Sequence, residues 1–359
     1  MRRSLHLLLF SMLLLACSSC RHHAEDAPGN TDSTVVQSEV LPQDEQGTAV
    51  RLDDPLVLTY RFTKGESFAY QIRKKESLSM FRDSLLDEKN DVTITRWYTF
   101  KVLESHSQGG GRLLAECVRV LYDGQYSGPS GKREMKYDSR ENNAPNTERL
   151  LSEFNAPVGH PFEVVVAPDG RIAAVEKLDA VIRNYMKEDY ATTKSDQIKA
   201  ITQDYAQTGI KSVLQLVFQK LHDKPVAQDS SWVIINARKL GYLSLRDDAV
   251  YTFHGITGAE LGKLAHIGVR LTSTYTGNPS FDTGQGWATM KDFDIAGVGR
   301  TSFNLDKGRV HRRSISNSVF VNMFVEPPEE LKRLAPDQAR NHWWSQKAVT
   351  EDNIEPYQP

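Results

Sequence analysis

Apolar and polar residues alternate over long stretches of this chain, which is the pattern of half-buried β-strands. The alternation is clearest over residues 92–102 and 113–122, and Gly109–Gly111 supplies a turn between them. A further hairpin is predicted around Pro168-Asp169-Gly170, because proline fixes φ and glycine tolerates a positive φ. Strands joined by short turns usually pair antiparallel, so we expect antiparallel sheets.

The apolar period changes to that of an α-helix between residues 176 and 224. The stripe is one-sided and its polar side is not strongly basic, which favours a helix that covers a sheet over one that lies on a membrane. The predicted fold class is therefore α+β, with strongly curved antiparallel β-sheets and this helical segment covering a sheet face. The apolar positions at helical spacing are Leu178, Val181, Ile182, Tyr185, Met186, Ile198, Ile201, Tyr205, Ile210, Val213, Leu214, Val217, Phe218 and Leu221.

The strand-rich stretches on either side of the helices share short motifs in the same order. Tyr98-Thr99-Phe100 recurs as Tyr251-Thr252-Phe253, and Gly111-Arg112-Leu113 recurs as Gly262-Lys263-Leu264. This order predicts two repeated β halves. The alternative is chance similarity, because strands of sheet proteins draw on few residue types. The three further matches relate 64–68 to 228–232, 118–120 to 269–271 and 170–172 to 308–310, and the halves would be 55–175 and 225–326 with the helices at 176–224.

The N-terminus has the parts of an export signal. Arg2 and Arg3 precede an apolar run from Leu5 to Ala16, which is shorter than the roughly 20 residues that span a bilayer. Leu14-Leu15-Ala16-Cys17 resembles the lipobox of bacterial lipoproteins, in which the cysteine is acylated, for example with palmitate. We therefore expect a signal peptide over 1–16 and lipid attachment at Cys17. The alternative is an ordinary secretory signal with free cysteines.

Residues 17–54 are polar, acidic and poor in aromatics, so they cannot bury enough apolar surface to fold. We expect a lipidated N-terminus and disordered tether there, followed by a folded body over 55–326. No second apolar run reaches membrane-spanning length, so the lipid would be the attachment to the membrane. Cys117 lies in a strand-like run, and we expect a buried, unreactive thiol.

Residues 327–359 form a C-terminal tail in this interpretation, and Glu351–Pro359 are expected to be disordered. Trp343 and Trp344 stand next to each other in it. They either dock on the domain, which we favour because exposed adjacent tryptophans reduce solubility, or anchor the protein to a partner or a membrane interface.

Common catalytic motifs are missing from the sequence, including the Gly-x-Ser-x-Gly elbow, His-Glu-x-x-His, phosphate-binding glycine loops and Cys-x-x-Cys. Asp282-Thr283-Gly284 matches the aspartic-protease triplet but lacks the second copy that a dyad needs, so we interpret it as a turn. His22-His23 lacks a nearby third metal ligand. We predict no catalytic residues, no metal and no cofactor. The formal net charge of −2 argues against a nucleic-acid partner.

The chain resembles a family of bacterial envelope lipoproteins that carry a domain of unknown function. The resemblance rests on the lipobox signal, Gly65-Glu66-Ser67-Phe68, Tyr137-Asp138-Ser139 and Gly159-His160-Pro161-Phe162 leading into 166–172, followed by helices. It covers about 55–320. The family has no assigned catalytic residues, so the resemblance implies no site residues.

Three hypotheses about function follow. The first is a non-catalytic binding or structural module, lipid-anchored in the bacterial envelope at the outer membrane and facing the periplasm, with a lipid or other apolar molecule as ligand. The second is an envelope hydrolase whose site no motif reveals, although the balance is against an enzyme. The third is a scaffold for envelope proteins. The ligand-binding residues are unknown at this stage.

Overall fold

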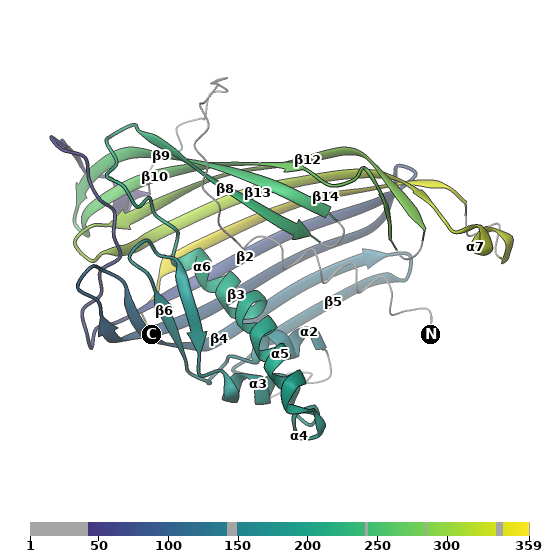
Figure 1. Ribbon diagram of the computed structural model, residues 1–359, viewed down its shortest axis with the longest axis horizontal. Coiled ribbons are helices and arrows are strands. Elements are labelled where there is room, and N and C mark those ends of the chain that lie inside the picture. The colour runs from purple at the N-terminus through teal and green to yellow at the C-terminus, as the bar shows by residue number, and fades with distance from the viewer. Residues whose placement is uncertain (1–41, 142–148, 241–242, 284–285, 335–339, 359) are drawn as a thin grey trace.

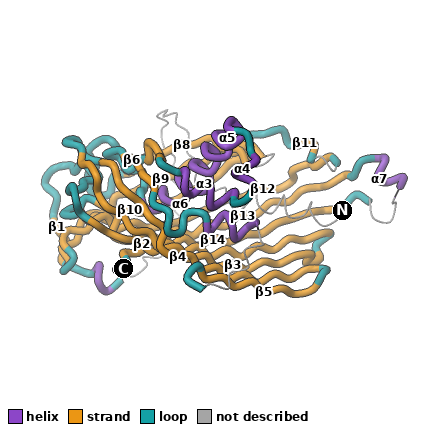
Figure 2. Tube along the Cα trace, turned by 90° about the horizontal axis from the view of Figure 1, so that it is seen from below, coloured by secondary structure: helices purple, strands orange, loops and turns teal. Residues whose placement is uncertain are grey.

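The computed structural model describes residues 42–141, 149–240, 243–283, 286–334 and 340–358. Within these residues, fourteen strands form one antiparallel sheet, which is open and curved (Figures 1 and 2). The prediction of a curved antiparallel sheet is thereby confirmed, but the strands of both predicted halves lie in a single sheet. The strands of the first half are β2 (Ser67–Arg82), β3 (Leu85–Ser105), β4 (Gly111–Gly128), β5 (Gly131–Asp138), β6 (Phe162–Val166) and β7 (Ile172–Glu176).

The second half of the chain supplies the other side of the sheet. The main path of the sheet starts at the short strand β1 (Thr48–Val50). Its order is β1-β9-β10-β12-β13-β14-β2-β3-β4-β6-β7, while β5, β8 and β11 pair with β4, β9 and β12. The C-terminal strand β14 therefore joins the two parts of the sheet. The bounds are β8 (Ser231–Leu240), β9 (Leu243–Ala259), β10 (Gly262–Tyr275), β11 (Ser280–Asp282), β12 (Trp287–Asn304), β13 (Arg309–Glu326) and β14 (His342–Pro356).

The helices within residues 179–217 are found where the helical period predicted them. They lie on one side of the sheet (Figure 1), and α6 contacts β2, β13 and β14. The chain makes a π-helical turn at Gly209, where an added Cβ would crowd the ring of Tyr205. Among the described residues, no helix is both long and apolar enough to cross a membrane. The bounds are α2 (Arg149–Asn155), α3 (Asp179–Met186), α4 (Asp189–Thr192), α5 (Ser195–Tyr205), the π-helix η2 (Ala206–Lys211), α6 (Ser212–Val217) and α7 (Glu329–Leu334).

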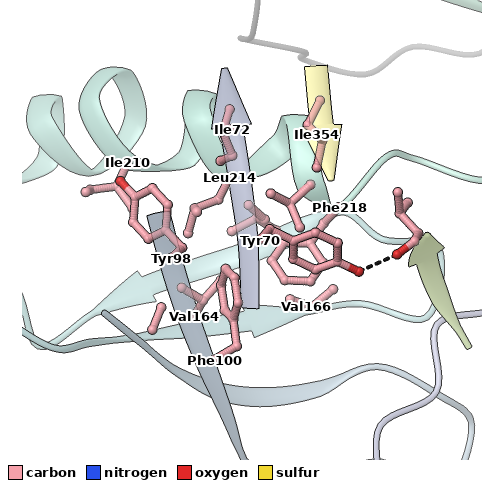
Figure 3. Packing of buried hydrophobic residues seen from close by; sticks show 14 of the residues in the cluster. Tyr70, Ile72, Tyr98, Phe100, Val164, Val166, Ile210, Leu214, Phe218 and Ile354 are labelled. Carbon is pink, nitrogen blue, oxygen red and sulfur yellow. Dashed lines mark hydrogen bonds between the residues drawn. The ribbon is translucent and has the colours of Figure 1, made fainter. Parts of the chain in front are cut away.

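The main hydrophobic core lies between the helical segment and the sheet (Figure 3). The Phe218 ring meets the rings of Tyr60 and Phe100 edge-on, with centroids 5.9 and 5.4 Å apart. Tyr70 donates a hydrogen bond to the carbonyl of Val310, which ties β2 to β13. Aromatic burial of this kind contributes most to the stability of such a core, since each ring removes a large apolar area from water.

The predicted disordered tether is wrong over its last part. Residues Gln43–Glu45 form a short 3-10 helix (η1), and Thr48–Val50 form β1, which pairs with β9. Glu45 is fully buried, accepts a hydrogen bond from the Ser302 hydroxyl at 2.5 Å, and pairs with Arg312 at 3.2 Å. A buried carboxylate needs such partners, so this segment belongs to the folded body.

The expectation of a disordered C-terminal end is also wrong. Strand β14 runs to Pro356 and pairs with β13 over residues 342–354 and with β2 over residues 344–356. Trp343 packs edge-on against Phe324 of β13, yet it remains 43% exposed. Part of the Trp343 side chain therefore docks on the domain, and part of it is exposed to solvent. Docking and contact with a partner or a membrane interface both remain as interpretations.

Candidate functional site

The two faces of β14 show how the sheet separates its side chains. Ala348, Thr350 and Asp352 are buried, whereas the intervening Val349 is 47% exposed and Glu351 is exposed. Residues directly opposite in an antiparallel pair share a face, so the registers of β13 and β2 extend this division. We call the side that carries Thr350 and contacts the helices the inner face, and the side that carries Val349 the outer face.

The inner face is apolar where the helical segment lies on it. Ile354 of β14 and Ile72 of β2 are opposite each other and fully buried in the main core (Figure 3). At the edge of this region, an Arg313 guanidinium nitrogen donates to the carbonyls of Gln215 and Leu216, at 3.2 and 2.9 Å. Cations are favoured at a helix C-terminus, so Arg313 stabilises the end of α6 and links it to the sheet.

Beyond Ile354 the inner face becomes polar. Asn317 of β13 lies opposite Thr350 of β14, and Asp352 follows two residues later on the same face. Oδ1 of Asn317, Oγ1 of Thr350 and Oδ1 of Asp352 are buried and have no hydrogen-bond partner in the described part of the chain. Buried polar atoms are normally satisfied by protein, water or ligand. We call these three residues the inner polar patch.

Glycine makes room for this patch on the neighbouring strand. Gly297 of β12 is opposite Asn317, and a Cβ at Gly297 would collide with Oδ1 of Asn317. The Asn317 side chain therefore extends over the β12 backbone, a position that any larger residue at 297 would close.

The charges around the patch nearly balance. Lys74 and Glu76 of β2 lie opposite Asp352 and Thr350, and they form an ion pair at 3.3 Å. Burial raises the pKa of Glu76, and Lys74 partly offsets this. Burial likewise raises the pKa of Asp352, against the opposing effect of Lys74, Arg313 and Arg96. A ligand at this place would therefore meet little net charge.

Past the polar patch the inner face is mainly apolar, although Gln346 of β14 is also buried on it. Leu243, Leu245 and Ile295 form a buried cluster separate from the main core, and Ile295 is opposite Val319 of β13. The side chains packed around this second cluster are Tyr275, Phe281, Met290, Phe293 and Val319, all only partly buried. This region therefore leaves apolar surface open to contact, which is characteristic of ligand sites.

The comparisons with known proteins place the chain in a family. Residues 125–308 match a family of unknown function (DUF6263), and this match covers just over half of the chain. The chain belongs to this family. No curated protein matches it. The recognition of an uncharacterised family is thus confirmed, and the matched residues of the DUF6263 family run from the end of β4 through β12.

Several solved structures resemble the fold distantly. One, on lipid–protein interactions in lipovitellin, is 7% identical with a TM-score of 0.43, and the alignment covers 83% of this chain but only 25% of the lipovitellin chain. The COG4313 outer membrane channel of Pseudomonas putida F1 is 9% identical with a TM-score of 0.20, covering 89% of this chain and 100% of the channel. OccK7 (OpdD) of Pseudomonas aeruginosa is 9% identical with a TM-score of 0.21, covering 83% and 100%. Scores this low carry no argument about function.

Several residues singled out in the sequence lie within the described part of this DUF6263 family member. Cys117 is free and fully buried, which confirms its expected burial, and this burial raises the pKa of its thiol to about 12. Asp282 ends β11, and Thr283 donates to the carbonyl of Gly286, as in a turn. Cys17 and the pair His22-His23 lie outside the described residues.

The histidines and carboxylates of the described residues do not gather into a metal-binding group of three or more. His266 is buried and hydrogen-bonded to the Thr257 hydroxyl at 2.8 Å, and burial lowers its pKa. Its other ring nitrogen lies 3.4 Å from the Ser302 hydroxyl, which itself donates to Glu45. This small network anchors the N-terminal segment to the sheet.

Sequence reasoning missed the inner polar patch entirely. Asn317 lies in a stretch that was expected to be strand, whereas Thr350 and Asp352 lie in the stretch that was expected to be tail. Their polar side chains are indistinguishable in the sequence from those of the solvated outer face. The one available signal is the β-branched content of Val349 and Thr350 within β14.

Proposed function

We propose that this protein is a non-catalytic binding module that holds a lipid or another apolar molecule against the inner face of its sheet. The observation that carries the proposal is the second apolar cluster around Ile295, whose surrounding side chains are only partly buried. A curved sheet with a partly open apolar region can take a long apolar ligand along its strands without further rearrangement.

In this proposal the protein is exported and attached to the membrane of the bacterial envelope through lipid on Cys17, at the outer membrane and facing the periplasm. The basis is the export signal and the lipobox of the sequence. Several acyl chains would hold it firmly, since each buried methylene contributes about 0.8 kcal/mol. The membrane would then be both the partner of the anchor and the source of the ligand.

We also propose that the sheet arose by duplication, with the helical segment covering the inner face between the halves. The strand order β2-β3-β4-β6-β7 matches β8-β9-β10-β12-β13. Gly111 and Gly262 open β4 and β10, and Gly170 and Gly308, both at positive φ, precede β7 and β13. The recurrence of motifs at equivalent points of equivalent strands supports a common origin.

The binding proposal is tested by native mass spectrometry of the full chain, expressed with its signal and released from detergent micelles. Val319→Glu places a charge in the second apolar region of the inner face, and we expect it to abolish co-purified lipid. Val349→Glu makes the same change on the exposed outer face and should retain the lipid. Circular dichroism establishes that both variants are folded.

Recovery of no lipid from the wild-type protein would contradict the carrier proposal. If both folded variants retain lipid equally, the ligand does not bind to the inner face.

A further inference from the structure

The inner polar patch gives the proposed ligand a second, polar contact. Asn317 is 6% exposed, Thr350 8% and Asp352 2%, and each has an oxygen without a hydrogen-bond partner in the residues that the structure describes. A buried polar atom without a partner loses the hydrogen bonds that it makes with water in the unfolded chain. Three such atoms on two paired strands are therefore a place where another molecule supplies the missing hydrogen bonds.

The patch borders the apolar region that would hold a chain. Asn317 is followed on the same face of β13 by Val319, which packs on the second apolar cluster. Thr350 is preceded on β14 by Ala348, which is opposite Val319 and Leu78. Neighbouring side chains on one face of a strand are about 6.6 Å apart. A ligand can thus place a polar group on the patch and an apolar chain over the cluster at the same time.

The hydrogen-bonding types of the patch restrict that polar group. The free Asn317 oxygen only accepts, Oδ1 of Asp352 accepts also when Oδ2 carries a proton, and the Thr350 hydroxyl both donates and accepts. The ligand must therefore bring donors. A fully ionised phosphate or carboxylate lacks donors, so it would leave the Asn317 oxygen unsatisfied.

The nearby positive charges make most of their contacts within the protein. Lys74 pairs with Glu76, Arg313 binds carbonyls at the end of α6, and the Arg96 guanidinium lies over the ring of Phe154 at 5.0 Å. These cations disfavour a cationic head group, and Nε of Arg313 on the same face is a donor without a hydrogen-bond partner in the described residues, so the site has free acceptors and a free donor. A neutral group with hydroxyls meets both conditions.

We propose that the inner polar patch binds the uncharged, hydroxyl-bearing head group of an amphiphile, whose apolar chain lies over the second cluster. The inference rests on the proposed binding function and names the chemical class of its ligand. Glycerol-type and sugar-type heads belong to this class.

Three probes with the same oleoyl chain test the assignment: 1-monooleoylglycerol, oleic acid and oleoyl lysophosphatidic acid. Each is titrated into the full-chain protein in detergent, and bound probe is counted by native mass spectrometry. We expect monooleoylglycerol to bind at the lowest concentration. Thr350→Val removes one hydroxyl at constant shape and should weaken this binding by roughly three- to tenfold.

Matched variants separate the patch from a general effect on the sheet. Thr272→Val makes the same change at an exposed position of the outer face of β10 and should leave binding unchanged. Thr350→Ser keeps the hydroxyl and should restore most of the affinity. Asn317→Ala provides a second patch variant and should weaken binding to a similar degree.

The outcomes distinguish this inference from the proposed function. If none of the three probes binds, the binding function itself is wrong. If all three bind alike and Thr350→Val and Asn317→Ala change nothing, the binding function stands and the assignment of the patch is overturned. Preference for the phosphate-bearing probe would overturn the argument for an uncharged head group.

Discussion

At the scale of single residues, Asp352 shows how the inner face differs from an ordinary protein interior. Its carboxyl group is buried in β14, and desolvation raises its pKa despite Lys74, Arg313 and Arg96 nearby. Its ionisation is therefore unfavourable in the folded protein. Such a residue is usually retained for a reason other than stability, which fits its place in the inner polar patch.

The pH dependence of Asp352→Asn follows from this raised pKa. The folded protein binds a proton at Asp352 that the unfolded chain releases near 3.8, so wild-type stability falls as the pH rises from there through the folded pKa. Below this window the variant and the wild type should be about equally stable. Above it the variant should be more stable by roughly 1–3 kcal/mol, the cost of an unsatisfied buried group.

Urea unfolding of both proteins from pH 4 to pH 8 measures this difference. A variant that is less stable than the wild type at pH 8 would mean that attraction to the three cations outweighs burial. A difference that does not change with pH would assign the effect to packing.

Single residues also show why the sequence alone could not predict the site. Alternation predicted the strands that contain Tyr98 and Leu113, because their inner positions are apolar and their outer ones polar. The same rule cannot find Thr350 or Asp352, since a polar residue on the inner face looks like one on the outer face. The burial that distinguishes them comes from strands far away in the chain.

At the scale of elements, β14 is the long strand that the sequence pattern did not predict. Its inner positions include Gln346, Thr350 and Asp352, so it is polar on both faces and has no apolar period. The helices, by contrast, were found readily, because residues such as Leu214 and Val217 repeat within one local segment. The pairing of β14 with β13 and β2 depends on contacts between the two ends of the body.

Removal of β14 should disrupt the sheet more than its position at the end of the chain suggests. A chain that ends at residue 341 leaves β13 and β2 without their shared partner and exposes two long strand edges. We expect it to lose the cooperative unfolding transition and to aggregate, as followed by circular dichroism and gel filtration. A control chain that ends at Tyr357 keeps β14 and should unfold like the wild type. Cooperative unfolding of the shorter chain would show that the two parts of the sheet are stable separately.

At the scale of the whole molecule, three regions of the inner face lie next to one another in a single sheet. The helix-covered core, the inner polar patch and the second apolar cluster follow one another along β13 and β14. The sequence predicted curved antiparallel strands and a helical segment, but it placed the strands in two halves. Only long-range pairing shows that both halves contribute to one face.

The central claim is that this face holds a lipid in the cell, and photo-crosslinking tests it most directly. Benzoylphenylalanine replaces Phe293, a half-buried ring of the second apolar region on the inner face, and in a matched strain it replaces Phe320, a half-buried ring on the outer face beside Lys347. Intact cells are irradiated, and the purified chain is analysed by mass spectrometry for attached lipid. The account predicts lipid adducts at position 293 and few or none at position 320. Adducts at neither position, or equally at both, would contradict it.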